Sequence, residues 1–177
     1  MTFNSFGQLS VVSGDFIIQS GASVVLTGNL SSNSNIEGPG KITLKGTVSQ
    51  NVNMNGFTIP NMEINNAQNV ILTSNGRIQN SLNFVSGKII IGNNNLTFSD
   101  IATTVGMGNN KFIETNNTGQ VFKELTGNVN SLVIPVGVSS VYRPVFITTT
   151  ATNFSGAKVG VRVLALSHAN KPPGTAD

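Results

Sequence analysis

Seven carboxylates and one histidine are the side chains of this 177-residue sequence best suited to acid–base or metal chemistry. A glycosidase or lyase needs two carboxylates that converge to about 5–10 Å, and Ca²⁺ needs several oxygen ligands close together. The acids are scattered, no Asp-x-Asp pair occurs, and Glu63 and Asp100 do not share a phase of any repeat. We therefore predict no catalytic residue, no metal ligand and no cofactor. The acids are Asp15, Glu37, Glu63, Asp100, Glu114, Glu124 and Asp177.

His168 is the only histidine, and its neighbourhood offers no second ligand. A single imidazole can act as a base or as a ligand, but the sequence places it after the last strand, beside the terminal loop. The chain has no Cys, which excludes disulfides and thiolate metal sites. Thr43, Thr58, Thr73 and Thr97 do not share a phase, which argues against a flat threonine array that orders ice.

The composition favours a β protein rich in turns. Charged residues make up 10% of the chain, against about 25% in an average domain, and the polarity comes from Asn, Ser, Thr and Gly. Asn and Gly tolerate positive φ and occur in turns, whereas helix formers are scarce. The formal charge of +3 is spread without a basic run, and there is no Trp. We therefore expect no nucleic-acid partner. We also expect no membrane insertion, because no run of 18 apolar residues occurs.

Short apolar-x-apolar triplets recur from residue 24 to residue 98 in three interleaved series with steps of 18–20 residues. A shared period of this length is typical of stacked coils, because one coil cannot bury its own apolar side chains. We predict a right-handed parallel β-helix with three strands per coil over residues 1–118. The series are 24–26, 42–44, 62–64 and 82–84; 52–54, 70–72 and 89–91; and 57–59, the neighbourhood of Ile78, and 96–98.

One alternative fold stays open at this point. Asn55-Gly56 and Asn75-Gly76 are dipeptides that favour type I′ hairpin turns. Hairpins at both places would give an antiparallel sandwich in place of a solenoid. The shared period of the three series favours the solenoid.

The pattern changes near residue 118. Longer strands are expected over residues 120–125, 131–136, 142–150 and 158–166, and Val159, Val161 and Val163 alternate with polar or small residues. This period of two is typical of a strand with one buried face. We predict a second domain over residues 119–177, the start of a β-sandwich-like unit. Because it ends in a loop at 170–177, we expect it to be truncated and completed by the remainder of a larger polypeptide.

Several motifs in the second half resemble a known class of proteins. The stretches NNKFIETNNTG at 109–119, IPVG at 134–137, YRPV at 142–145 and PPGTAD at 172–177 resemble large secreted β-repeat surface proteins of Bacteroidota. The resemblance is strongest over residues 88–177. It implies an exported, adhesin-like protein carried by the type IX secretion route, and it brings no catalytic residues with it. Residues 1–5 lack the regions of a signal peptide, which leaves either a cytoplasmic protein or an excised piece of a larger exported chain. The resemblance favours the second.

The fold prediction and the resemblance together lead to one expected function. We expect a non-catalytic structural stalk, spacer or adhesion module of a large exported protein at the extracellular or outer-membrane surface. Its expected partners are an extracellular polysaccharide or another cell-surface ligand, and the remainder of the parent polypeptide. The alternative is a carbohydrate-binding or carbohydrate-processing β-helix module, which converging acids or an aromatic-lined groove would favour.

Overall fold

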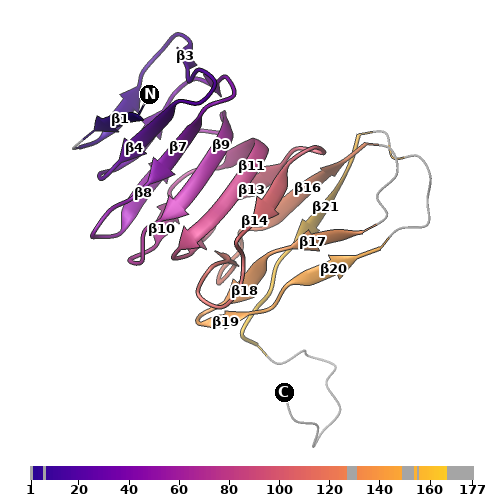
Figure 1. Ribbon diagram of the computed structural model, residues 1–177. Helices are drawn as coiled ribbons and strands as arrows, with labels where there is room; N and C mark the ends of the chain where they lie inside the picture. Colours follow the sequence, from indigo (N-terminus) through magenta and orange to yellow (C-terminus); the bar gives the residue numbers. More distant parts are fainter. Residues whose placement is uncertain (1, 6, 127–130, 149–153, 155, 167–177) are drawn as a thin grey trace, which may run out of the picture.

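The computed structural model describes residues 2–5, 7–126, 131–148, 154 and 156–166. Within these residues the chain is all-β, a solenoid of about six turns whose strands stack in parallel (Figure 1). The predicted fold class is therefore confirmed. In the described part of the chain, no helix is long and apolar enough to cross a membrane. His168 and Asp177 lie outside the described residues.

Three strands make one coil, and equivalent strands of successive coils form three faces. The first face contains β1 (Thr2–Ser5), β4 (Ser23–Leu26), β7 (Lys41–Leu44), the second halves of β9 (Thr58–Asn65) and β11 (Gly76–Ser86), and β14 (Thr103–Val105). The second face contains β2 (Leu9–Val11), β5 (Leu30–Ser32), β8 (Gln50–Asn53), β10 (Val70–Leu72), β12 (Ile89–Ile90), β15 (Ile113–Glu114) and β18 (Val136–Val138). The third face contains β3 (Phe16–Ile17), β6 (Ile36–Glu37), the first halves of β9 and β11, β13 (Leu96–Phe98) and β16 (Val121–Leu125).

The strand register confirms the first and third predicted series. Met62 pairs with Ile42 and with Leu82 on the first face, and Ile78 pairs with Ile59 and Phe98 on the third. The second series was predicted in the wrong register, because its first triplet starts two residues too late. On that face Leu72, not Val70, pairs with Val52.

The hairpin alternative is wrong. Asn55 and Gly56 do adopt positive φ, 46° and 84°, and the Phe57 amide donates to the Met54 carbonyl at 2.7 Å. This is a tight turn, but it joins β8 to β9, which do not pair with each other. The turn is a corner of the coil, and β8 pairs in parallel with β5 and β10 instead.

Alternate side chains of each strand fill the interior of the solenoid. On the first face Leu26, Leu44, Ile64 and Phe84 form one buried column, each at most 1% exposed. Burial of one such side chain stabilises the fold by about 1.5–3 kcal/mol. Because every coil adds to the same column, stability accumulates with each coil.

Asparagine side chains bind one coil to the next at the corners. The Oδ1 atom of Asn75 accepts a hydrogen bond from the Asn95 amide at 2.8 Å, and Oδ1 of Asn95 accepts one from the Gln120 amide at 3.0 Å. Asn29 and Asn69 accept amides of the following coil in the same way. These four asparagines thereby satisfy backbone amides at or near strand ends.

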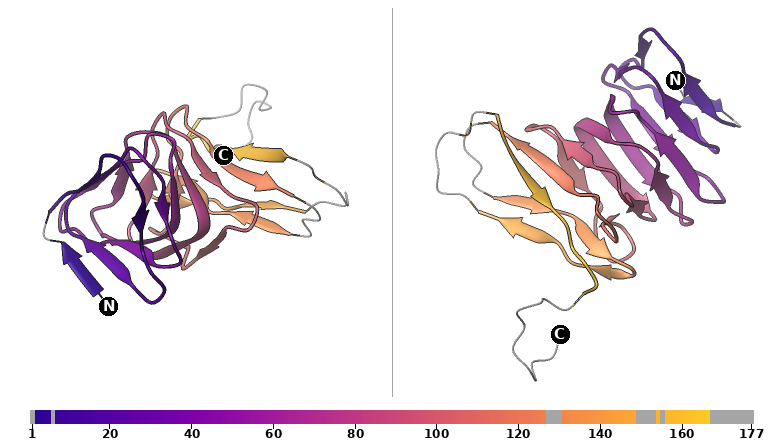
Figure 2. Two further views of the ribbon diagram at one scale, coloured as in Figure 1. Left: turned by 90° about the horizontal axis from the view of Figure 1, so that it is seen from above. Right: turned by 180° about the vertical axis from the view of Figure 1, so that it is seen from behind.

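Antiparallel strands complete the far end of the stack. β21 (Ala157–Val161) pairs with β16, β19 (Val141–Tyr142) pairs with β18, and β17 (Leu132–Ile134) pairs with β20 (Val145–Ile147). Figure 2 shows these strands extending from the last coils. The parallel stack itself continues past residue 118 through β16 and β18, so the division into two domains at that residue stays a prediction.

Candidate functional site

Three glutamates, Glu63, Glu114 and Glu124, are bound to cations of other coils. Glu63 Oε2 lies 2.7 Å from Lys41 Nζ, on the outer side of the first face. Glu114, on the second face, is paired with Lys88 under the turn between β18 and β19, whose Ser139 carbonyl also accepts from Lys88 at 2.6 Å. These carboxylates therefore lie on different faces and act as links between coils.

The environment of Glu63 favours its charged form. Burial alone would raise the pKa of this carboxyl group, but hydrogen bonds from Lys41, Asn83 and Thr43 outweigh it and hold the pKa below the ordinary value. A lowered pKa suits a structural carboxylate and opposes a role as a general acid at neutral pH.

The other acids that the structure describes do not gather into a site. Asp100 accepts a hydrogen bond from Thr126 in the loop after β13, away from Glu63 on the first face. Asp15 and Glu37 are exposed. No group of three His, Cys, Asp or Glu side chains in the described residues is placed to hold a metal ion.

A polar hollow lies where the third face turns into the first. With the coils numbered from β1–β3 as coil one, coil two is β4–β6, and coil three runs from β7 to the first half of β9. The corner that ends coil three is shorter than those beside it: two residues separate the inward-facing Ile59 and Met62, whereas three to five separate the equivalent side chains of neighbouring coils. A short corner between longer ones leaves a depression. We call it the corner groove; its volume is about 410 Å³, and it is lined by Asn35, Ile36, Glu37, Gly38, Thr58, Pro60, Arg77, Gln79 and Asn80.

A β-bulge shapes the floor and one wall of the groove. Ile59 pairs with Ile78 and Asn61 with Ser81, so Pro60 alone lies opposite both Gln79 and Asn80. The extra residue turns side chains outward at the bend. Proline tolerates this position because it has no amide hydrogen to pair. The bulge therefore presents two side-chain amides beside the groove floor.

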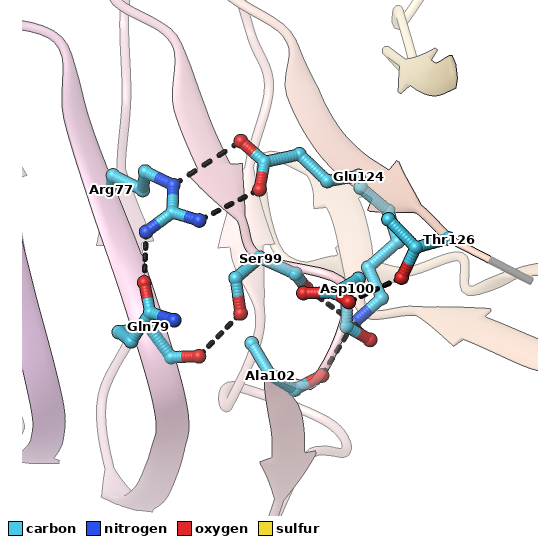
Figure 3. Close-up of polar contacts among 8 residues, drawn as sticks. Arg77, Gln79, Ser99, Asp100, Ala102, Glu124 and Thr126 are labelled. Carbon is cyan, nitrogen blue, oxygen red and sulfur yellow. Dashed lines mark hydrogen bonds and ion pairs between the residues drawn. The ribbon is translucent and has the colours of Figure 1, made fainter. Parts of the chain in front are cut away.

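Arg77 is fixed by a hydrogen-bond network, drawn in Figure 3. Its Nε and Nη2 atoms donate to Glu124 Oε1 and Oε2 at 3.2 and 2.7 Å, and Nη1 donates to Oε1 of Gln79. The hydrogen bonds with Glu124 raise the pKa of the guanidinium. Two-point binding of this kind holds both partners in a defined orientation, so the network fixes the amide of Gln79 at the groove wall.

Lys123 lies behind this network with its ammonium group inside the solenoid. Nζ donates to the carbonyl oxygens of Ser99, Asp100 and Ala102 at 2.6, 2.9 and 2.7 Å, and the residue is 8% exposed. Burial lowers the pKa of this amine despite the negative charges of Asp100 and Glu124. The lysine therefore organises the loop at 99–102 from within.

The sequence contained signals for part of this arrangement. Lys123 alternates with Val121 and Leu125, a period of two that predicts an inward side chain. No sequence signal pairs Arg77 with Glu124, because the two are joined only by the coil register across β13.

The expectation that the four threonines share no phase is wrong for one pair, although the row that this pair forms is interrupted. Thr58 and Thr97 lie in one row of the third face, but Arg77 lies between them. Thr43 lies on the first face and donates to Glu63 at 3.3 Å. A continuous threonine surface is thus interrupted on both faces.

Comparison with known proteins gives no further constraint. No family model, curated protein or solved structure matches this chain.

Proposed function

We propose that this chain is a non-catalytic structural stalk, spacer or adhesion module of a large exported protein at the extracellular or outer-membrane surface. The observation that carries the proposal is the use of carboxylates as links between coils. Glu63, Glu114 and Glu124 are each bound to a lysine or arginine of another coil. Carboxylates that could take part in acid–base chemistry therefore form ion pairs that hold the coils together. The resemblance of residues 88–177 to surface proteins of Bacteroidota supports the location and export by the type IX route.

The links between coils also favour an extended, rigid element. Parallel backbone ladders run along the stack, and corner asparagines add side-chain hydrogen bonds between the same coils. The ion pair between Arg77 and Glu124 spans two strand spacings, since β13 lies between their strands. Several kinds of bond would have to break together before one coil could separate from the next.

A carbohydrate-binding or carbohydrate-processing module is the second candidate, and the corner groove is the observation that favours it. The groove is lined by polar side chains with unused hydrogen-bonding atoms. Among its described lining residues, Glu37 is the only acid, whereas the usual glycosidase mechanism uses two carboxyl groups. The geometry supports binding more than cleavage.

Surface location can be tested on intact cells of the source organism. Antibodies raised against this chain should label unpermeabilised cells, and external proteinase K should remove the signal while a cytoplasmic protein stays intact. Labelling only after lysis would contradict the proposal. In parallel, the purified chain should release no reducing ends from neutral or acidic polysaccharides. Activity abolished by Glu37→Gln would instead establish the processing alternative.

A further inference from the structure

We propose that the corner groove binds a neutral polysaccharide chain across coils two to four. This inference rests on the adhesion role proposed above, to which it adds a site and a ligand class. It rests on three properties of the groove: its unused hydrogen-bonding atoms, its balance of charge and its rigidity.

The groove offers many hydrogen-bonding atoms that have no protein partner among the described residues. The carboxylate of Glu37, the side-chain amide of Asn80 and the hydroxyl of Thr58 make no hydrogen bond there. Asn35 accepts from the Thr58 amide at 3.0 Å, which leaves its Nδ2 unused, and Gln79 engages only its Oε1. Both donors and acceptors are therefore presented, which is what a ligand rich in hydroxyl groups requires, because each hydroxyl both donates and accepts.

The charges in the groove select against an acidic ligand. Among the described lining residues Arg77 is the only cation, and its charge is balanced by the carboxylate of Glu124, to which it donates two hydrogen bonds. Glu37 is an exposed carboxylate without a cationic partner in the described residues. The local balance is thus negative, so uronic acids and sulfated sugars are repelled, whereas a neutral sugar accepts hydrogen bonds from the amides and donates to Glu37.

The groove is held in shape before any ligand arrives. Arg77 and Gln79 are oriented by the network with Glu124, and the ring of the buried Pro60 restricts the backbone at the groove floor. A fixed site avoids part of the entropy lost on binding. From Glu37 in coil two to Gln79 in coil four, the groove crosses two strand spacings, about 10 Å, which is about the length of a disaccharide.

The test is calorimetric titration of the whole chain with cellohexaose, mannohexaose, xylohexaose, maltohexaose and, as the acidic probe, hexagalacturonate. At least one neutral hexasaccharide should bind, and hexagalacturonate should bind more weakly or not at all. Asn80→Ala and Glu37→Ala should each weaken the neutral ligand by about tenfold, as expected when one or two hydrogen bonds to it are lost. The matched control is Asn51→Ala, which removes an exposed side chain of β8 on the second face and should leave binding unchanged.

Three outcomes would overturn the inference: no neutral hexasaccharide binds, hexagalacturonate binds more tightly, or the groove variants bind like the unsubstituted chain. Circular dichroism of each variant ensures that lost binding reflects the groove and not unfolding. The failures of the two proposals are distinguishable. If no sugar binds, the proposal of a structural module at the cell surface still holds. If cells are labelled only after lysis, the surface location is refuted, whereas the result of the sugar titration is unchanged.

Discussion

Gly87 is the position where a single added methyl group should disturb the solenoid most. It lies at the corner between β11 and β12 with φ at 84°, and a Cβ placed there would overlap the Asn66 carbonyl oxygen of the preceding coil and lie 2.8 Å from its carbon. Gly56 has the same φ of 84°, but a Cβ there meets nothing within 4 Å. The two glycines therefore separate the cost of backbone conformation from the cost of steric overlap.

The expected magnitudes follow from this difference. A non-glycine residue in the left-handed region costs about 1–2 kcal/mol, and Gly56→Ala should lower the free energy of unfolding by that amount. Gly87→Ala carries the same cost and must also push apart two coils. That movement strains the bonds from the Asn66 amide to Ser86 at 3.0 Å and from the Val70 amide to Lys88 at 2.9 Å. Disruption of two such bonds, with their buried groups left unpaired, adds about 2–4 kcal/mol.

Equilibrium unfolding in urea, followed by circular dichroism, measures both variants on the same scale. We expect a loss of about 1–2 kcal/mol for Gly56→Ala and about 3–6 kcal/mol for Gly87→Ala. If the two losses agree within about 0.5 kcal/mol, the close approach of Gly87 to the preceding coil does not hold in solution, and the reasoning about coil spacing fails.

Three further perturbations probe the polar interior and the corners. Burial lowers the folded-state pKa of Lys123, so the unfolded chain holds this proton more tightly. As the pH rises from the lowered pKa to about 10.5, the free energy of unfolding of the unsubstituted chain should therefore increase relative to that of Lys123→Met. Urea unfolding at several pH values measures this difference. The folded-state pKa of Glu63 is lowered from 4.5, so its contribution is present above that pH and lost as the pH falls through the folded-state value. Glu63→Gln should flatten this part of an acid titration followed by circular dichroism. Asn95→Ala removes the acceptor of the Gln120 amide and should cost about 1 kcal/mol, whereas Asn51→Ala should stay within about 0.5 kcal/mol in the same urea assay.

The architecture could be predicted because the solenoid repeats one local rule. Inward triplets such as those at 42–44 and 62–64 recur at one period, and stacking identical coils is the arrangement that buries all of them. The turn at Asn55 and Gly56 shows the limit of local signals. Its backbone is that of a hairpin turn, yet the strands on either side pair with other coils because the apolar pattern, not the turn, fixes the partner.

The candidate site was much harder to predict because it arises from differences between coils. The groove exists because the corner at Pro60 is shorter than its neighbours, and Gln79 and Asn80 point outward because of a bulge. The spacing of the apolar triplets does not reveal either feature, because that spacing already varies by one or two residues between coils. The pairing of Arg77 with Glu124, 47 positions apart, depends on the exact register of three strands.

Because the corners vary in length, an insertion at a corner should differ in its structural effect from an insertion inside a strand. An extra residue inside a strand would invert the faces of every side chain that follows it, exposing a column such as that of Leu44 and Ile64. An extra residue at the corner beside Pro60 is absorbed as a bulge, as the opposite strand already does at Gln79 and Asn80. Insertions at this corner can therefore change the shape of the groove while the strands keep their register. The binding surface can vary between sequences with little loss of solenoid stability.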